Sequence, residues 1–421
     1  MILKNASFIV TLNPKKEVIT DGAIYIEDSS IVDIGKTSEI MRKYSDDEII
    51  DCKNKLIMPG LINTHTHAAT VLMRGLGEDM ELMEWLEKKI WPFESKLKEK
   101  DVYHASLLAC IEMIKNGITC FNDMYFFMDS VAKACLKIGI RASLSWALID
   151  KEIIPSTNSL ENCKRFIKRW KNNELIIPSV GPHAIYTCSE ETLLKAKEIA
   201  DKYNTLLHIH LSETEKEVED CLKKHGKRPA EYLNSIEFLD KNVIAAHCVW
   251  LNKKEIKILS EKGVKVSHCP ISNMKLAVGK AMPLPEMLKE RVIVSLGTDG
   301  AASNNSLDLF ETMKFAALLH KHEKMDPTVT KAYKILEMAT IDGARALSLE
   351  DKIGSIEEGK KPDLIILDIN KAHWKPSHDV IANLVYSCKS SDVETVIING
   401  KIVMKEKKIL TTNEEKILKS F

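Results

Sequence analysis

The feature that most constrains the fold is a regular alternation of strand-like and helix-like segments between about residues 56 and 355. The expected strands are residues 56–67, 117–124, 141–148, 176–187, 205–213, 243–251, 264–272 and 292–301. Amphipathic stretches fall between most of them, at 101–115, 128–138, 190–203 and 252–262. Strands that alternate with helices are typical of parallel βαβ units. Eight such units predict an α/β fold, the (β/α)8 TIM barrel.

The two ends of the chain have a different texture. Residues 1–55 and the C-terminal stretch both contain short strand-like segments separated by turn residues. Each end alone has too few strands to bury a core. We therefore expect residues 1–55 and 360–421 to form one small β-sandwich domain beside a catalytic barrel of residues 56–359.

Polar residues stand at the C-terminal ends of the expected strands. They are His65, His67, Asp123, His183, His210, His247, His268 and Asp299. The groups that carry out chemistry in a TIM barrel collect at the carboxyl ends of its strands. The sequence therefore predicts an active site at that face.

The first strand ends in His-Thr-His, which is typical of half a metal site. Side chains at i and i+2 of a strand share one face, so His65 and His67 are expected to converge on one point. The fifth strand adds His210, preferred to His208 because it lies nearer the strand end. Asp299 follows the eighth strand; a turn residue is the alternative there, because Asp-Gly is a common turn pair. With three histidines expected beside it, we interpret Asp299 as a ligand.

These side chains predict one divalent metal per subunit. Some barrel hydrolases bridge two metals with a modified lysine at the end of the fourth strand. Here the fourth strand ends with His183 and has no lysine. Three histidines and one aspartate suit Zn²⁺, with Fe²⁺ as the alternative. A metal centre with an open position for water is suited to hydrolysis.

Composition excludes other classes of protein. The chain has 421 residues, with 60 Lys and Arg against 60 Asp and Glu. This balance argues against a partner that is nucleic acid or a membrane surface. The ten cysteines include no CxxC pair, which favours reduced thiols in the cytoplasm over a disulfide framework. No apolar run approaches the length of a membrane span.

Several motifs together resemble the amidohydrolase superfamily. They are PGLINTHTH, HIHLSETEKEV, AAHCVWL, SHCPISNMKLAVG and GTDGAASNNSLDLFETMK. The resemblance covers nearly the whole chain and is stronger to deaminases of 5′-methylthioadenosine, S-adenosylhomocysteine and 5′-deoxyadenosine. It implies a metal-dependent hydrolytic deaminase that converts the 6-amino group of an adenosine derivative to an inosine-type product and ammonia. Enzymes of this family commonly form homo-oligomers, so a dimer or tetramer is expected.

The resemblance also implies roles for matched positions. The metal ligands would be His65, His67, His210 and Asp299. Glu213 would move a proton to the purine N1, and His247 would hold the attacking water or help to deprotonate it. Asp299 would pass a water proton to the leaving amine.

Further matched positions would bind the substrate. His183 would hydrogen-bond the substrate, and Glu94 would hold the ribose hydroxyls. Trp85 is a candidate for packing against the nucleoside, but a core anchor is the commoner role of such a residue. We interpret His268 as a satisfied core histidine.

The third strand bears on the 5′ substituent. Arg141 begins this strand and is not expected to reach the site, whereas Trp146 is expected near the site end. An apolar group there favours 5′-deoxyadenosine or 5′-methylthioadenosine over S-adenosylhomocysteine, whose amino-acid carboxylate calls for a cation.

Three alternatives remain open at this point. The same metal site would also suit deamination of guanine or cytosine, or hydrolysis of a triazine. A metal-binding scaffold without activity is the second alternative. A cysteine hydrolase is the third, disfavoured because Cys248 and Cys269 follow histidines on strands and point to the opposite face.

Overall fold

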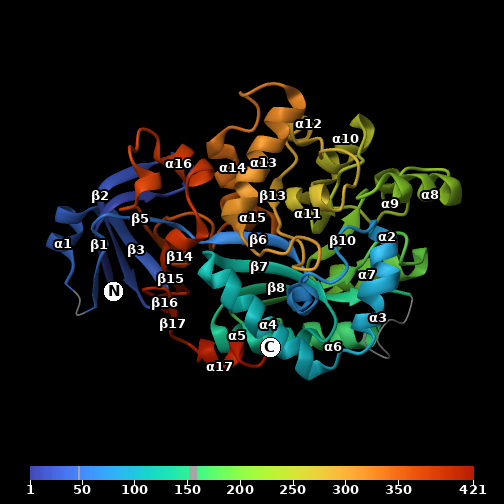
Figure 1. The fold of residues 1–421 in the computed structure, drawn as a ribbon, viewed down its shortest axis with the longest axis horizontal. Helices are drawn as coiled ribbons and strands as arrows, with labels where there is room; N and C mark the ends of the chain where they lie inside the picture. The colour runs from blue at the N-terminus through green and yellow to red at the C-terminus, as the bar shows by residue number, and fades with distance from the viewer. Residues whose placement is uncertain (46–47, 151–158) are drawn as a thin grey trace.

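The computed structural model describes residues 1–45, 48–150 and 159–421. Figure 1 shows a barrel of strands and helices beside a separate sheet that contains both the first and the last strands of the chain. This is the expected architecture, a TIM-like barrel with a β domain made from the N- and C-terminal segments. Among the described residues, no helix is both long and apolar enough to cross a membrane.

The barrel consists of eight parallel strands that follow one another in chain order. They are β6 (Leu61–Thr66), β7 (Ile118–Tyr125), β8 (Arg141–Leu148), β9 (Ile176–Pro182), β10 (Leu207–Leu211), β11 (Val243–His247), β12 (Lys265–His268) and β13 (Val294–Leu296). Almost all of their side chains are buried, as expected for strands covered on both faces. Where β13 approaches β6, the Asp299 N–H donates to the His65 carbonyl at 2.9 Å.

Helices cover the outside of the barrel. They are α4 (Glu99–Lys115), α5 (Met128–Ile138), α6 (Leu160–Trp170), α7 (Glu190–Tyr203), α8 (Glu215–His225), α9 (Pro229–Ser235), α10 (Lys253–Lys262), α11 (Pro270–Lys275), α12 (Leu284–Lys289), α13 (Leu309–Lys324), α14 (Ala332–Met338) and α15 (Ile341–Ala346). The four helices expected from the sequence are all present. Their ends follow local chemistry: Ser189 and Asn252 cap α7 and α10 through their side chains, and Gly139 ends α5 in the left-handed region.

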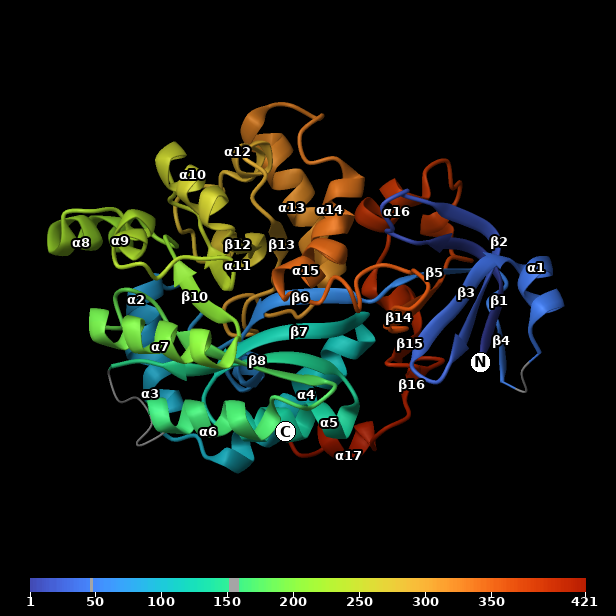
Figure 2. The same cartoon turned by 180° about the vertical axis from the view of Figure 1, so that it is seen from behind.

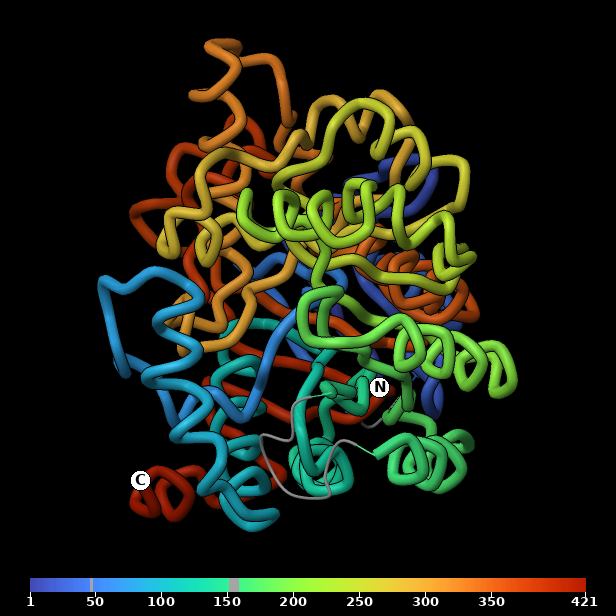
Figure 3. The backbone as a smooth tube through the Cα atoms, turned by 90° about the vertical axis from the view of Figure 1, so that its right-hand side faces the viewer, coloured from blue at the N-terminus to red at the C-terminus, as the bar shows by residue number. Residues whose placement is uncertain are grey.

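The segment between β6 and α4 forms short helical turns near the carboxyl ends of the strands. They are η1 (Ala68–Met73), α2 (Leu82–Trp85), the π-helical turn η2 (Leu86–Ile90) and α3 (Trp91–Glu94). In Figure 3, the blue-to-cyan helices α2 and α3 lie on one side of the view, and the green helices α6 and α7 lie on the other.

The separate sheet is built from both ends of the chain. Its strands are β1 (Ile2–Val10), β2 (Val18–Glu27), β3 (Ser30–Lys36), β4 (Ile49–Asp51), β5 (Lys55–Pro59), β14 (Leu364–Asp368), β15 (Val393–Ile398), β16 (Lys401–Lys405) and β17 (Lys408–Ile409). The antiparallel pairing of β14 with β5 joins the two ends. Figure 2 shows this sheet from behind, with α1 (Thr37–Lys43) at its outer edge. The remaining helical turns are η3 (Ala372–Trp374), α16 (Val380–Tyr386), η4 (Ser390–Asp392) and α17 (Glu414–Leu418).

The first expected strand, residues 56–67, is two strands in the structure. β5 belongs to the terminal sheet and β6 to the barrel, with Gly60 between them. A Cβ at Gly60 would lie 2.1 Å from Thr119 Oγ1, so the chain can change sheets here only without a side chain. The domain limits given above stay a prediction.

A buried ion pair ties the barrel to the terminal sheet. Arg141 Nε donates to Asp363 Oδ2 at 2.8 Å, and both side chains are almost fully buried. Arg141 also donates to the Glu174 carbonyl, and Asp363 accepts from the Asn399 N–H. Arg141 stands at the amino end of β8. The expectation that it does not reach the active face is confirmed.

Replacing Arg141 with methionine should destabilise the fold. The substitution leaves the Asp363 carboxylate buried without its counter-ion, which costs about 3–5 kcal/mol in unfolding free energy. Urea unfolding of Arg141→Met measures the loss. Arg165→Met, a matched change on an exposed part of α6, should leave the midpoint unchanged. Equal midpoints for Arg141→Met and wild type would contradict this account.

Candidate metal centre and active site

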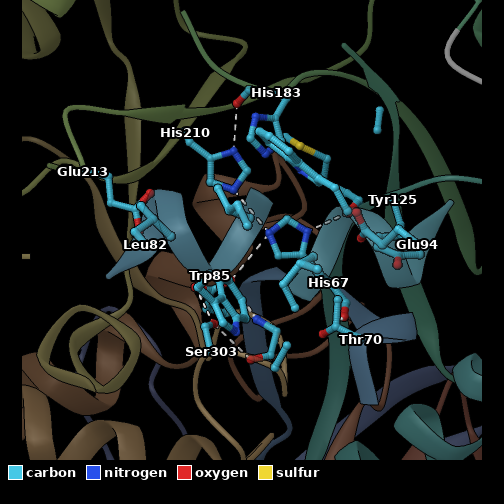
Figure 4. A pocket seen from close by; sticks show the side chains of 18 of the residues that line it. His67, Thr70, Leu82, Trp85, Glu94, Tyr125, His183, His210, Glu213 and Ser303 are labelled. Carbon is cyan, nitrogen blue, oxygen red and sulfur yellow. Dashed lines mark hydrogen bonds and ion pairs between the residues drawn. The ribbon is translucent and has the colours of Figure 1, made fainter. Parts of the chain in front are cut away.

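The four predicted ligands converge at the carboxyl ends of the strands. His67 Nε2 lies 3.2 Å from His210 Nε2. Asp299 Oδ1 lies 3.4 Å from His65 Nε2 and 3.5 Å from His67 Nε2. Figure 4 marks this contact between the His67 and His210 rings with a dashed line. The side chains that the sequence places at the ends of β6 and β10 and after β13 thus meet at one point.

The spacing and chemistry of these atoms fit a metal ion. Tetrahedral ligands with bonds of about 2.0–2.1 Å lie about 3.3 Å from one another, close to the separations observed. Buried His65 Nε2 has no hydrogen-bond partner among the described residues and faces Asp299 Oδ1. Burial lowers the pKa of His65 to about 4, so its ring is neutral and offers a lone pair. A buried lone pair without a donor, aimed at a carboxylate and other imidazoles, suits a cation.

Hydrogen bonds at the far nitrogens aim two of the histidines. His67 Nδ1 donates to the Met124 carbonyl at 2.7 Å, and His210 Nδ1 donates to the His183 carbonyl at 2.7 Å. Each bond fixes the tautomer and leaves Nε2 free to act as a ligand.

His208 lies behind the centre and not in it. Its Nε2 is 2.8 Å from His65 Nδ1, and its Nδ1 is 3.1 Å from Asn122 Nδ2. The preference for His210 agrees with this geometry, since His210 is the histidine of the fifth strand that faces His67. His208 instead supports the far side of the His65 ring.

Asp299 is held by several donors. Its Oδ2 accepts from Ser272 Oγ at 2.6 Å and Ser303 Oγ at 2.9 Å, and its Oδ1 accepts from the Gly300 N–H at 2.7 Å. Burial opposes the charge on Asp299, but the surrounding imidazoles, His247 among them, hold the pKa of its carboxyl well below the usual range. The side chain is therefore an ionised and oriented carboxylate. Sequence reasoning missed Ser272 and Ser303, although each lies four residues after a polar residue, His268 or Asp299, that it had placed at a strand end.

Glu213 and His247 lie beside the centre. Glu213 Oε1 is 3.8 Å from His247 Nε2, and His247 Nδ1 is 2.8 Å from Asn273 Oδ1. Burial raises the pKa of Glu213 above its usual value. Burial opposes the charge on His247, but Glu213 and Asp299 raise the pKa of its ring. His247 also groups with His65 and His210, since one nitrogen from each lies within 4.8 Å of the others.

A pocket opens over these groups. Figure 4 shows Glu213 on one side of His67 and His210, and Glu94 with Tyr125 on the opposite side. Apolar side chains form much of the remaining wall: Leu82, Trp85, Leu86, Ile90, Trp91, Phe126, Ala147, Ile149, Leu276 and Ala302. Within the described ranges, no lysine or arginine lines this pocket. It is therefore suited to a largely apolar ligand with a few polar anchors.

Glu94 and His183 supply polar anchors at this pocket. Burial raises the pKa of Glu94 to about 7, and Tyr125 beside it acts in the opposite direction. His183 Nδ1 is 2.9 Å from Thr187 Oγ1. Burial lowers the pKa of His183 to about 3, so its ring is neutral. Sequence reasoning did not identify Tyr125, which ends β7 and carries no charge or metal-ligand signal.

The structure decides the positions of two tryptophans, Trp85 and Trp146. Trp85 lines the pocket, and its Nε1 donates to the Leu76 carbonyl at 3.0 Å. The expectation that Trp146 stands at the site is wrong, because its ring packs against Phe166 of α6 with centroids 5.6 Å apart. Strand alternation instead turns Ala147 toward the pocket. Residues 151–158, which follow this strand in the sequence, lie outside the described residues.

The other candidates lie away from the chemistry. His268 is buried and pairs with His320 through their Nε2 atoms at 3.0 Å, which agrees with a core position, but its Nδ1 has no hydrogen-bond partner among the described residues, so it is only partly satisfied. Cys248 and Cys269 are fully buried, and burial raises the pKa of both thiols well above the usual value. A buried, protonated thiol is a poor nucleophile. The geometry therefore disfavours a cysteine hydrolase.

Comparison with known proteins shows the family of the chain. The model of the amidohydrolase family matches residues 56–403. The chain is 48% identical over 405 residues to a 5-methylthioadenosine/S-adenosylhomocysteine deaminase of Thermodesulfovibrio yellowstonii, across 95% of this chain and 92% of the relative. It is 49% identical over 421 residues to a 5′-deoxyadenosine deaminase of Methanosarcina mazei, across 99% and 96%.

A solved structure is also similar over the whole length. It is an adenosine deaminase from Xanthomonas campestris with bound zinc, at a TM-score of 0.97 and 32% identity. The match covers 100% of this chain and 96% of the other.

Replacing His67 with asparagine should weaken metal binding. Asparagine removes the imidazole nitrogen that faces His210 and Asp299, so zinc retained after dialysis should fall well below the wild-type content. Elemental analysis of the folded proteins measures it. His104→Asn, on an exposed turn of α4, is the matched control and should retain the wild-type content. Full zinc content in His67→Asn would contradict the assignment.

Proposed function

The chain belongs to the amidohydrolase family, and we propose that it removes the 6-amino group of adenosine-type nucleosides by metal-dependent hydrolysis. The products are the inosine-type nucleoside and ammonia. The observation that carries the proposal is the position of Glu213, a buried carboxyl beside a His₃Asp centre at the mouth of the barrel. The similarity to deaminases of 5′-deoxyadenosine and 5′-methylthioadenosine supports the same substrate class.

We assign the metal ligands to His65, His67, His210 and Asp299. The chemistry of this donor set favours one Zn²⁺ per subunit, with Fe²⁺ as the alternative. A divalent metal at such a centre lowers the pKa of water, so that hydroxide is available near neutral pH.

Glu213 acts as the acid toward the purine ring. Its raised pKa keeps a proton on the carboxyl at higher pH than in an ordinary glutamic acid. Donation of that proton to N1 makes C6 a better electrophile, because the ring nitrogen then accepts the electrons displaced by attack. His247, fixed by Asn273, faces Glu213 and is placed to hold the attacking water.

Asp299 transfers a proton from the attacking water to the leaving amine. As an ionised carboxylate, it takes one water proton and gives it to the leaving amine. A bond forms between the water oxygen and C6, and the C6–N bond breaks as ammonia leaves. The second water proton restores Glu213, so N1 keeps the proton that Glu213 gave. The two carboxyls thus play different roles because their surroundings set different pKa values.

Glu94 and His183 bind the remainder of the nucleoside. We assign the ribose hydroxyls to Glu94, which lies across the pocket from Glu213. His183 is neutral and lines the same pocket, where it hydrogen-bonds the substrate. A base held at Glu213 and a sugar held at Glu94 would use both polar ends of the cavity.

The walls of the pocket favour a small apolar 5′ substituent. Ala147 and Ile149 lie along the pocket at the carboxyl end of β8, and no described lining residue is a lysine or an arginine. An amino-acid carboxylate on the 5′ side would therefore find no lysine or arginine partner among the described lining residues. We propose 5′-deoxyadenosine or 5′-methylthioadenosine as preferred substrates over S-adenosylhomocysteine.

We place the enzyme in the cytoplasm and expect a homo-oligomer, a dimer or tetramer. All ten cysteines are free thiols, and nine are buried, which agrees with a reducing compartment. Exposed Phe315 and Leu318, about one turn apart on α13, offer an apolar surface for assembly.

Replacing Glu213 with glutamine should abolish most of the deaminase activity. Glutamine has the same size but no acidic proton to donate, so kcat should fall by about 10²–10⁴-fold. Ammonia release from 5′-deoxyadenosine by zinc-loaded protein measures it. Glu219→Gln, an exposed glutamate on α8, should behave as wild type. A wild-type kcat in Glu213→Gln would contradict the assigned role.

The preference for the 5′ substituent should appear in kcat/KM. Because a charged amino-acid group is desolvated without a partner, kcat/KM for S-adenosylhomocysteine should be at least about tenfold below that for 5′-deoxyadenosine. Steady-state ammonia release with the two substrates and 5′-methylthioadenosine gives the ranking. A clear preference for S-adenosylhomocysteine would contradict it.

A further inference from the structure

Glu217 is a buried carboxylate four residues after Glu213. Its Oε1 accepts from the Ser212 N–H at 2.8 Å, and its Oε2 accepts from the Glu213 N–H at 2.8 Å. The side chain is only 4% exposed. No lysine, arginine or histidine of the described ranges forms an ion pair with it. Both oxygens are therefore committed to the two backbone donors at the turn that carries Glu213.

This arrangement differs from ordinary helix capping. Thr214 already caps α8, since its Oγ1 accepts from the Glu217 N–H at 3.2 Å. In a capping box, the acid at the third helical position reaches back to the N–H of the cap residue itself. Glu217 stands at that position but reaches past Thr214 to the two residues before it. Its carboxylate therefore fixes the turn that precedes the helix.

The turn that Glu217 holds is strained. Ser212 has φ of +50°, in the left-handed region that residues other than glycine seldom adopt. The Ser212 carbonyl accepts from the Trp250 N–H at 2.8 Å. Glu217 and Trp250 thus hold the Ser212 backbone through its N–H and its carbonyl. Strained backbone of this kind persists where the surroundings over-determine it, commonly at active sites.

Stability alone does not account for a carboxylate in this place. Taking a carboxyl group out of water without a counter-ion costs free energy. Burial accordingly raises the pKa of Glu217 to about 7. The Ser212 and Glu213 N–H donors offset part of this cost, and both belong to the turn that carries Glu213.

We infer that Glu217 is a positioning residue that fixes the backbone turn of Glu213 and so aims the Glu213 carboxyl into the pocket. The catalytic consequence rests on the function proposed above, because it is Glu213 that gives a proton to the substrate. Glu217 itself lies outside the residues that line the pocket and does not touch the substrate.

Three variants test this inference in the full-length zinc-loaded protein. Glu217→Gln keeps the size but turns an N–H donor toward a backbone N–H, so one hydrogen bond is lost. Glu217→Asp keeps two acceptor oxygens on a shorter side chain. Glu215→Gln makes the same chemical change on an exposed residue in the same first turn of α8 and serves as the control.

The first readout is hydrogen exchange at residues 211–214, which contain both N–H donors. Exchange there should be faster in Glu217→Gln than in wild type and Glu215→Gln, because the protected amides lose an acceptor. The second readout is turnover of 5′-deoxyadenosine. Glu217→Gln should lower kcat by about tenfold to a hundredfold. KM should change by less than about twofold, and Glu217→Asp should recover part of kcat.

Two results would overturn the inference. One is wild-type exchange at residues 211–214 in Glu217→Gln, and the other is faster exchange with an unchanged kcat. If the role of Glu217 were merely structural, Glu217→Gln would lower stability without a fall in kcat at nearly constant KM. Should Glu217→Gln fail to fold, Glu217→Asp decides by the same two readouts. If wild type releases no ammonia from any adenosine-type nucleoside, the proposed function fails, and hydrogen exchange alone decides whether Glu217 holds the turn.

Discussion

The convergence of three imidazoles and one carboxylate on a single point is the interaction on which the rest of this structure depends. Among the described residues, the Nε2 of buried His65 has no hydrogen-bond partner. A cation between these side chains would use that lone pair and balance the buried carboxylate. Parallel strands make the convergence possible, because they bring the ends of β6, β10 and β13 to one face of the barrel.

The backbone around this centre is held in unfavourable conformations. Ser212, His247 and Asp299 all have positive φ, and each stands at or just beyond the end of a barrel strand. Left-handed residues turn the chain sharply, so that a side chain points into the mouth and not along the strand. Hydrogen bonds from Ser272 and Ser303 to Asp299, like those accepted by Glu217, hold side chain and turn in place. The barrel strands thus form a rigid frame, and the strained residues at their ends orient side chains toward the mouth of the barrel.

The periodicity of the sequence and the positions of strand ends predict the barrel and much of the candidate site. The direction of individual side chains is harder to predict from the sequence. His65 and His67 could be placed on one face because alternation in a strand has a fixed period of two. Trp146 does stand near the carboxyl end of β8, but its position along the strand does not fix its direction, and its ring packs against Phe166 while Ala147 lines the pocket. The change of sheet at Gly60 depends on the distant Thr119, and the role of Glu217 depends on a turn. Neither contact leaves a periodic signal in the sequence.

The most direct test of the account is ammonia release by the metal-loaded protein from nucleosides and free bases under the same conditions. A base held at Glu213 and a sugar held at Glu94 predict turnover of 5′-deoxyadenosine, 5′-methylthioadenosine and adenosine, with guanine and cytosine inert. Turnover of a free base in preference to the nucleosides, or no turnover of any nucleoside with the metal fully loaded, would contradict it.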